Sequence, residues 1–215
     1  MYNFTFNIPT KIHFGKDTIS SLSELKAYGS KVLLVYGGGS IKKNGLYDTA
    51  MKILKDAGLT VFELSGVEPN PKIETVRKGV EICKNEGIDM VLAIGGGSTI
   101  DCSKVVAAGA KYDGDAWDLV LDGSKVKAAL PIFDVLTLSA TGTEMDPFAV
   151  ISDMSKNEKW GTGSPYMVPT MSILNPEYTF SVSKKQTAAG TADMMSHTME
   201  NYFSMENADC QKFMA

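Results

Sequence analysis

The sequence predicts an α/β fold: a parallel-sheet dinucleotide-binding domain with helices on both faces, followed by the start of an all-helical domain. Three observations lead to this prediction. Apolar runs of strand length alternate with amphipathic stretches, two of these runs end in the same Gly-Gly-Gly-Ser loop, and the chain turns helical from Lys184 onward. Strands that are apolar on both faces are typical of a parallel sheet covered by helices. We expect the first domain to cover residues 1–182 and the helical part to cover 183–215.

Length and composition are those of an ordinary globular protein. The chain has 215 residues, of which 44% are hydrophobic and 21% charged,. Its net charge is -4 and its basic residues are scattered, which argues against a nucleic-acid partner,. No apolar run approaches the roughly 20 residues of a membrane helix, and we expect no signal peptide because the first residues form neither a basic nor an apolar segment,. Since its three cysteines form no CxxC pair, we expect a cytoplasmic protein with reduced thiols,.

The individual elements follow from hydrophobic periodicity and from glycine and proline positions. Residues 4–8 and 11–14 alternate apolar and polar side chains around Pro9-Thr10, which predicts an antiparallel hairpin,. Glycines close two of the expected helices, and three prolines interrupt the strands and loops expected between 148 and 180,. The buried strands are expected at 31–36, 60–64, 90–94 and 130–138, and the helices at 46–57, 73–85, from about 98 to 110, and from 184 with Ser183 as N-cap,.

The two Gly-Gly-Gly-Ser loops, 37–40 and 95–98, each lie between a predicted strand and the start of a helix. Glycines at this position let the backbone approach a phosphate, which the N–H groups of the following helix then bind. Neither loop matches GxGxxG, because Lys42 and Ile100 occupy the third glycine position,. A single such loop is equally explained as a tight turn, but two loops at one edge of a sheet favour a diphosphate ligand.

Two further patterns lie close to these loops. Ser98 and Asp101 have the spacing of a helix capping box, in which the serine side chain caps the helix,. The small-residue loop 139–143 follows a predicted strand, where its hydroxyl groups would either contact a ligand or cap a helix.

Asp193 and His197 are four residues apart in the predicted final helix, which places both side chains on one face,. Carboxylate and imidazole ligands suit Fe²⁺ or Zn²⁺, although an Asp–His pair at this spacing is more often a solvated ion pair. A metal site needs at least three protein ligands, and the only other histidine, His13, lies in the predicted hairpin,. Either the pair is not a metal site, or its partners lie outside this chain.

Taken together, six segments resemble the iron-containing (group III) alcohol dehydrogenases, most closely their NAD(P)H-dependent butanol dehydrogenase branch. They occur in the family's order over nearly the whole chain, which makes the combination specific. The segments are IPTKIHFGKDTI, VYGGGSIKKNGLYD, LSGVEPNPKIETVRKGVEICK, AIGGGSTIDCSK, LTLSATGTEMD and TAAGTADMMSHTMENYF.

The resemblance implies an enzyme that interconverts primary alcohols and aldehydes, with its active site between an α/β dinucleotide domain and an all-helical domain. It also implies a divalent metal, Fe²⁺ or Zn²⁺, held by one Asp and three His, and a homodimer when full length. Asp193 and His197 match the first two ligands. The remaining histidines would follow residue 215, so we expect this chain alone to be an inactive N-terminal part.

The resemblance further assigns cofactor contacts and a cofactor preference. NAD-specific relatives often carry an Asp at the position of Gly39, where an acid would repel a 2′-phosphate; Gly39 therefore favours NADP, with NAD the alternative. Glu63 is the acid that a Rossmann interpretation would assign to NAD. The expected contacts are Gly38, Gly39 and Ser40 in the first loop, Asn70 in the VEPNP turn near the adenosine, Gly95, Gly96, Gly97 and Ser98 in the second loop with Asp101 just after it, Thr137, Ser139, Thr141 and Thr143 in the third, and Lys159 near the ribose.

Two other functions remain open at this point. A glycerol dehydrogenase or a sugar-phosphate cyclase has similar glycine loops, but the GTADMMSH and GGGSTID segments favour the alcohol dehydrogenase. A non-catalytic nucleotide-binding module would fit if 215 residues were the natural length.

Overall fold

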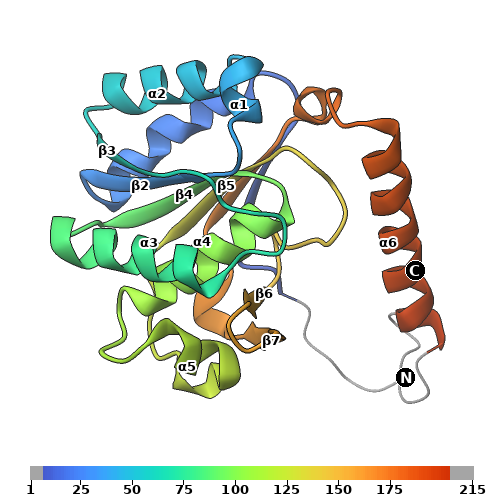
Figure 1. The fold of residues 1–215 in the computed structure, drawn as a ribbon. Helices are drawn as coiled ribbons and strands as arrows, with labels where there is room; N and C mark the ends of the chain where they lie inside the picture. Colours follow the sequence, from blue (N-terminus) through green and yellow to red (C-terminus); the bar gives the residue numbers. More distant parts are fainter. Residues whose placement is uncertain (1–6, 204–215) are drawn as a thin grey trace.

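The computed structural model describes residues 7–203, and none of its helices in that range is long and apolar enough to cross a membrane. A six-stranded parallel sheet forms the centre, in the order β1-β8-β5-β4-β2-β3 (Figure 1). This confirms the predicted fold class. Its strands are β1 (Lys11–Phe14), β2 (Lys31–Tyr36), β3 (Thr60–Leu64), β4 (Met90–Gly95), β5 (Ile132–Leu136) and β8 (Met171–Leu174).

Helices cover both faces of this sheet and bury two separate apolar layers. Successive side chains of a strand point to opposite faces, so Leu33 and Val91 pack toward one helical layer while Leu34 and Leu92 pack toward the other. All four of these side chains are fully buried. One layer contains η1 (Thr18–Tyr28), α1 (Ser40–Lys43) and α2 (Leu46–Asp56), and the other contains α3 (Ile73–Glu86), α4 (Gly97–Gly109) and α5 (Ala116–Leu121).

A separate antiparallel hairpin lies beyond the second helical layer. It is formed by β6 (Phe148–Asp153) and β7 (Glu158–Gly163), and Thr162 on β7 ties it to α5 by donating its hydroxyl to the Leu119 carbonyl. The described part of the chain also contains three short 3₁₀ turns: η2 (Gly123–Lys125), η3 (Pro165–Met167) and η4 (Pro176–Thr179).

The sheet reverses its direction of growth at β2. From β2 the chain moves outward to β3, and it then crosses back to place β4 on the other side of β2. In open parallel sheets, ligands bind outside the carboxyl ends of the strands at such a reversal. The two Gly-Gly-Gly-Ser loops follow β2 and β4, so they lie on either side of this crevice.

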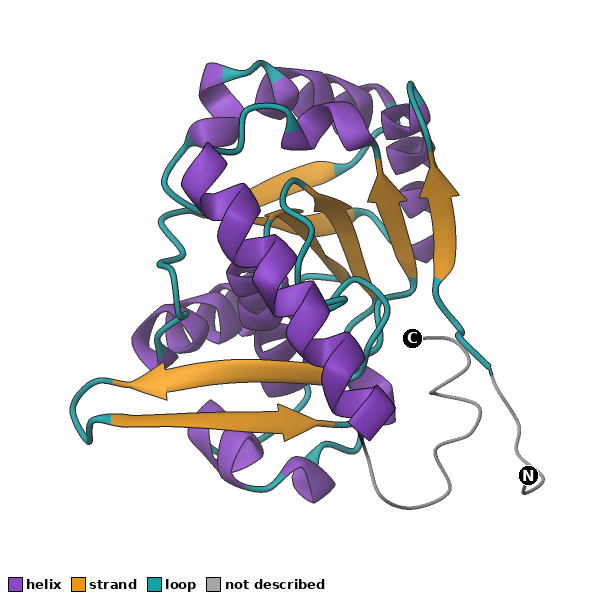
Figure 2. Cartoon of the chain, turned by 90° about the vertical axis from the view of Figure 1, so that its right-hand side faces the viewer, coloured by secondary structure: helices purple, strands orange, loops and turns teal. Residues whose placement is uncertain are grey.

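The last described helix, α6 (Lys184–Phe203), lies beside the sheet rather than in either helical layer (Figures 1 and 2). Ser183 caps it as predicted, because the backbone N–H of Gln186 donates to Ser183 Oγ at 3.3 Å. Along α6, Gly190 is buried and almost every other described side chain is exposed. This arrangement supports a boundary near residue 183, which stays a prediction.

The predicted hairpin at the start of the chain is wrong for the residues that the structure describes. Strand β1 pairs in parallel with β8, with Lys11 opposite Met171, and residues 7–10 form no strand. Residues 4–6 of the other predicted strand lie outside the described residues. Alternation of side chains indicates that a segment is extended, but it carries no information about which strand will be its neighbour.

Candidate functional site

Three loops that follow adjacent strands form the floor of the candidate site. They follow β2, β4 and β5, whose parallel carboxyl ends lie at one edge of the sheet. The second and third loops are joined by a backbone hydrogen bond of 2.9 Å, from Thr137 N–H to the Gly95 carbonyl. They also touch at Gly97, where a Cβ atom would lie 3.2 Å from Thr141 Oγ1. The three loops that carry most of the predicted contacts therefore converge on one edge of the sheet.

The first loop leaves its backbone open to solvent. A Cβ atom on Gly38 or on Gly39 would meet nothing within 4 Å. Gly39 has φ +94°, a left-handed conformation that residues with a side chain rarely adopt, and Ser40 then begins α1,. Open backbone at the end of a buried strand permits the close approach of a diphosphate or ribose.

The second loop differs from its prediction in one respect. Helix α4 begins at Gly97 with Gly96 as its N-cap, so Ser98 lies inside the first turn and does not form a capping box with Asp101. The glycines explain the difference, because they let the helix begin two residues earlier than it would with Ser98 as its cap,. The loop thus presents the free N–H groups of the α4 N-terminus to the crevice.

Asn70 connects two of the predicted cofactor residues that are far apart in the sequence. Its backbone N–H donates to Ser98 Oγ at 3.3 Å, and its side-chain Oδ1 accepts from Lys159 Nζ at 2.7 Å. Asn70 has φ +56°, a conformation that asparagine tolerates better than most residues,. The lysine of the β6–β7 hairpin is thereby drawn to the second glycine loop, where its charge would complement a phosphate.

Asp101 and Thr143 face into the protein instead of the crevice. Thr143 Oγ1 donates to Asp101 Oδ1 at 2.7 Å, and the N–H of Val150 donates to Asp101 Oδ2 at 3.0 Å. Burial raises the pKa of Asp101, although these two hydrogen bonds oppose the shift. Asp101 and Thr143 therefore hold the third loop and the hairpin onto α4.

Sequence analysis missed Lys104, which completes this network. Its side chain is 0% exposed, and Nζ lies within 2.9 Å of Thr143 Oγ1, both Asp146 O and Oδ1, and the Phe148 carbonyl. The available signal was a lysine directly before the apolar run 105–108 of the same helix, because a buried charge requires partners,.

Glu63, the alternative acid for NAD, is already engaged. Its carboxylate accepts from Tyr36 Oη at 2.6 Å and from Tyr47 Oη at 2.7 Å, and Lys42 Nζ lies 3.9 Å away. Burial works against ionisation, but these hydroxyl groups and the lysine hold the pKa of Glu63 below its ordinary value. Glu63 therefore links β2, β3, α1 and α2 behind the first loop.

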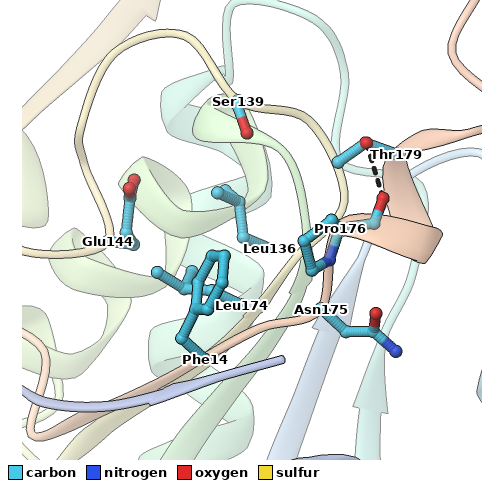
Figure 3. Close-up of a pocket in the computed structure, with 8 residues that line it drawn as sticks. All are labelled: Phe14, Leu136, Ser139, Glu144, Leu174, Asn175, Pro176 and Thr179. Carbon is cyan, nitrogen blue, oxygen red and sulfur yellow. Dashed lines mark hydrogen bonds between the residues drawn. The ribbon is translucent and has the colours of Figure 1, made fainter. Parts of the chain in front are cut away.

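A pocket of about 140 Å³ opens beside the third loop (Figure 3). Its floor is apolar, with the ring of Phe14 beside Leu136 and Leu174, and the Ser139 and Glu144 side chains lie around it. An apolar floor with few polar groups suits a small organic molecule. Its other lining residues are Asn175, Pro176 and Thr179.

Helix α6 brings the two predicted metal ligands close together. His197 Nε2 lies 3.7 Å from Asp193 Oδ1, and the two side chains are 54% and 42% exposed. Among residues 7–203, no group of three or more His, Cys, Asp or Glu side chains could hold a metal ion. His13 on β1 instead has Nε2 3.2 Å from Glu24 Oε1. The pair is thus an open, two-ligand arrangement.

Gly190 sets the position of α6 against the third loop, a contact that sequence analysis did not identify. A Cβ atom there would lie 3.0 Å from the Ser139 carbonyl oxygen. The helix that carries Asp193 and His197 therefore touches the same loop that contains predicted cofactor contacts.

Comparison with known proteins agrees with this geometry. The family described as "Iron-containing alcohol dehydrogenase" matches residues 9–176. The chain is 62% identical over 205 residues to NADH-dependent butanol dehydrogenase A of Clostridium acetobutylicum, covering 95% of this chain and 53% of that protein. It is 40% identical over 205 residues to the NADPH-dependent aldehyde reductase YqhD of Escherichia coli, covering 94% of this chain and 52% of that protein.

The solved structures agree as well. The crystal structure of NADH-dependent butanol dehydrogenase A from Thermotoga maritima superimposes with a TM-score of 0.95 at 47% identity, covering 100% of this chain and 55% of that one. The chain spans about half the length of the curated relatives it matches. With a family match over most of its length, the chain belongs to the iron-containing alcohol dehydrogenase family.

Proposed function

We propose that the full-length protein interconverts primary alcohols and aldehydes, of butanol type, by hydride transfer to or from a nicotinamide dinucleotide. The single observation that carries this proposal is the pair of Gly-Gly-Gly-Ser loops on either side of the sheet reversal at β2. Their open backbone and the N-terminus of α4 suit a diphosphate, and the names of the relatives supply the substrate class,.

Most predicted contacts have a defined part in this proposal, whereas Asp101 and Thr143 support the third loop from inside the protein. Gly38, Gly39 and Ser40 receive the adenosine ribose and its phosphate, and the second loop receives the diphosphate through backbone N–H groups. Asn70 and Lys159 would lie beside the diphosphate, where the ammonium group of Lys159 would offset the phosphate charge. Thr137, Ser139 and Thr141 border the nicotinamide end, next to α6.

We infer that the first loop accepts NADP and also NAD. No side chain closes the space around Gly39, so nothing in the loop repels a 2′-phosphate. Two relatives at 62% and 60% identity are named as NADH-dependent, whereas one at 40% is named as NADPH-dependent. The ratio of kcat/KM for the two cofactors measures the preference.

Asp193 and His197 would hold a divalent metal, Fe²⁺ or Zn²⁺, together with ligands outside the described residues. Their oxygen and nitrogen donors suit such ions and already lie on one helix face,. When bound, the metal would supply Lewis-acid polarisation of the substrate oxygen. The chain's own residues would orient the cofactor through the three loops.

We also propose that the full-length protein is a homodimer. Strand β1 is an edge of the sheet, and Phe14 at its end is 71% exposed. A strand edge with no partner among residues 7–203 is a frequent kind of association site,. Sedimentation of the full-length protein at two concentrations tests this point.

Calorimetric titration of the 215-residue chain with NADH and with NADPH tests the binding part of the proposal. We expect one binding event per chain for at least one cofactor. No heat with either cofactor would contradict the assignment of the loops. The catalytic part is tested by cofactor oxidation with butyraldehyde in the full-length protein, with and without added Fe²⁺ or Zn²⁺.

A further inference from the structure

Strand β5 carries a buried carboxyl group that the proposed cofactor contacts do not use. The side chain of Asp134 is 1% exposed, in the middle of the sheet, between Ala93 on β4 and Ser172 on β8. Its Oδ1 has no hydrogen-bond partner among the described residues, and its Oδ2 lies 2.6 Å from Ser172 Oγ.

The hydroxyl group of Ser172 contacts a second oxygen as well. Ser172 Oγ lies 2.7 Å from the carbonyl oxygen of Glu144, in the segment that follows the third loop. A hydroxyl carries one proton and a carbonyl oxygen carries none. Both short contacts are hydrogen bonds only if one more proton is present, and the carboxyl group of Asp134 is the group that can supply it.

The surrounding charges also favour a protonated, neutral carboxyl group at Asp134. Lys104 on α4 is the nearby cation, but its protons are directed to acceptors at 143, 146 and 148 rather than to Asp134. An ionised Asp134 would add a buried negative charge to a region that already contains several acids. Burial raises the pKa of Asp134 well above its ordinary range. Glu144 is the acid whose charge acts on Asp134, whereas Asp146 and Asp101 lie around Lys104 and take up its charge.

We propose that Asp134 is a neutral positioning residue, which donates its proton to Ser172 so that Ser172 in turn donates to the Glu144 carbonyl. This chain of hydrogen bonds fixes the segment after β5 against the sheet. The positioning role rests on the proposed function, because the loop at 137–143 contains expected cofactor contacts. The protonation state does not depend on that function.

Replacing Asp134 by Asn tests the protonation state. The Asn side-chain N–H₂ keeps a donor to Ser172 and removes the titratable group. A carboxyl group with a raised pKa in the folded state loses stability as pH rises above its unfolded value of 3.8,. We therefore expect Asp134→Asn to be more stable than wild type at neutral pH. The unfolding constant of the wild type divided by that of the variant should rise about tenfold per pH unit above 3.8, until the folded pKa is reached,.

The matched control is Asp113→Asn at an exposed loop position, which we expect to leave the unfolding constant nearly unchanged. Infrared spectra of the wild type should also contain a protonated carboxyl band that shifts in D₂O and is lost in Asp134→Asn. An Asn variant that is less stable than wild type at every pH, with no such band, would show that Asp134 is ionised and overturn the proposal.

Replacing Ser172 by Ala tests the positioning role. It removes the bridge to Glu144, so we expect about tenfold weaker NADH binding and faster amide exchange in residues 137–148, whereas Asp134→Asn keeps both near wild type. Ser103→Ala is the control, because that fully buried hydroxyl bonds only within α4, to the Thr99 carbonyl.

The outcomes separate the two proposals. A wild-type chain that binds neither NADH nor NADPH would contradict the proposed function, and amide exchange in Ser172→Ala would still decide the positioning role. Unchanged exchange and affinity in Ser172→Ala, or an equal loss in Ser103→Ala, would overturn the positioning role of Asp134.

Discussion

At the scale of single residues, a substitution of Gly38 tests ligand binding with less effect on folding than a substitution of Gly95 or Gly96. A Cβ atom on Gly96 would lie 3.2 Å from Leu138 Cβ, and one on Gly95 would lie 2.4 Å from Thr99 Oγ1. A side chain at either position therefore disturbs the protein itself. At Gly38 a Cβ atom meets nothing within 4 Å and the backbone is not left-handed. Only a ligand would collide with a side chain there.

We predict that Gly38→Val abolishes cofactor binding and changes the thermal midpoint little. The branched side chain fills the space that a ribose or phosphate needs, while the fold offers it room,. Calorimetric titration and thermal unfolding of the same sample measure the two effects. Gly161→Val is the control, since this exposed hairpin glycine also has free space for a Cβ atom. Full affinity in Gly38→Val would place the cofactor elsewhere.

Gly39→Asp should weaken NADPH binding far more than NADH binding. A carboxylate at this position would face the 2′-phosphate, and like charges at contact distance oppose binding. The left-handed backbone, φ +94°, is tolerated by Asp better than by most residues,. The measurement is the ratio of the two dissociation constants, with Gly39→Asn as the uncharged control. Equal losses for both cofactors would mean that the 2′ position lies away from this loop.

Glu63 gives a contrasting prediction, because its carboxylate is occupied by two tyrosine hydroxyl groups. We expect Glu63→Gln to leave the NADPH-to-NADH ratio unchanged. It should lower stability above about pH 4.5, the ordinary pKa, and this gap should close as pH falls through the lower folded pKa,. Denaturant unfolding at several pH values measures this, with exposed Glu81→Gln as the control. A changed cofactor ratio would make Glu63 a ribose contact.

At the scale of secondary-structure elements, periodicity predicted the sheet well and its connections less well. The strands at 60–64 and 90–94 and the helices at 46–57 and 73–85 were correct within a residue or two. Their signal is local, since each depends on which face of the segment is apolar. The parallel pairing of β1 with β8 depends on residues about 160 positions apart, and no local pattern contains it.

The polar network beneath the third loop was beyond local patterns for the same reason. The spacing of Asp101 from Ser98 predicted a capping box, but the hydrogen-bond partners of Asp101 are Thr143 in the loop and Val150 in the hairpin. Asp134 and Ser172 are Cα partners on adjacent strands that are 38 residues apart in sequence. Which polar side chains share one buried space is decided by the sheet order, which only the tertiary structure supplies.

The anchoring role of Lys104 leads to a stability prediction. We expect Lys104→Met to lower the free energy of unfolding by about 3 kcal/mol, because acceptors at 143, 146 and 148 lose their donor and Asp146 loses its counter-charge,. Denaturant unfolding measures the loss. Lys78→Met on the exposed face of α3 is the matched control. Equal stability of Lys104→Met and wild type would mean that the loop is held by other contacts.

At the scale of the whole molecule, α6 differs from the rest of the described chain. The sheet and its two helical layers bury continuous apolar clusters, whereas α6 buries Gly190 against the third loop and exposes Met195, Met199 and Phe203 by 58%, 47% and 70%. Exposed apolar side chains on one helix indicate a surface that normally packs against other protein. The proposed dinucleotide contacts therefore lie within the sheet and its loops, whereas the described residues supply only two of the proposed metal ligands, Asp193 and His197.

This difference leads to the last prediction, which concerns the metal. Asp193 and His197 are the two proposed ligands on α6, whereas His13 on β1 lies against Glu24 of η1. A site with two protein ligands must fill its remaining positions with water, which gives weak binding. We therefore predict that the purified 215-residue chain retains no stoichiometric Fe²⁺ or Zn²⁺ and does not reduce aldehydes with NADPH, while still binding the cofactor.

Mass spectrometry of metal content after gel filtration, with His197→Ala as the matched variant, measures this directly. The wild type and the variant should retain equally little metal, and both should self-associate as concentration rises because α6 exposes its apolar side chains in each,. The full-length protein should retain about one metal ion per chain and lose it in His197→Ala. Stoichiometric metal in the 215-residue wild type, lost in the variant, would mean that further ligands come from within this chain or from a second copy.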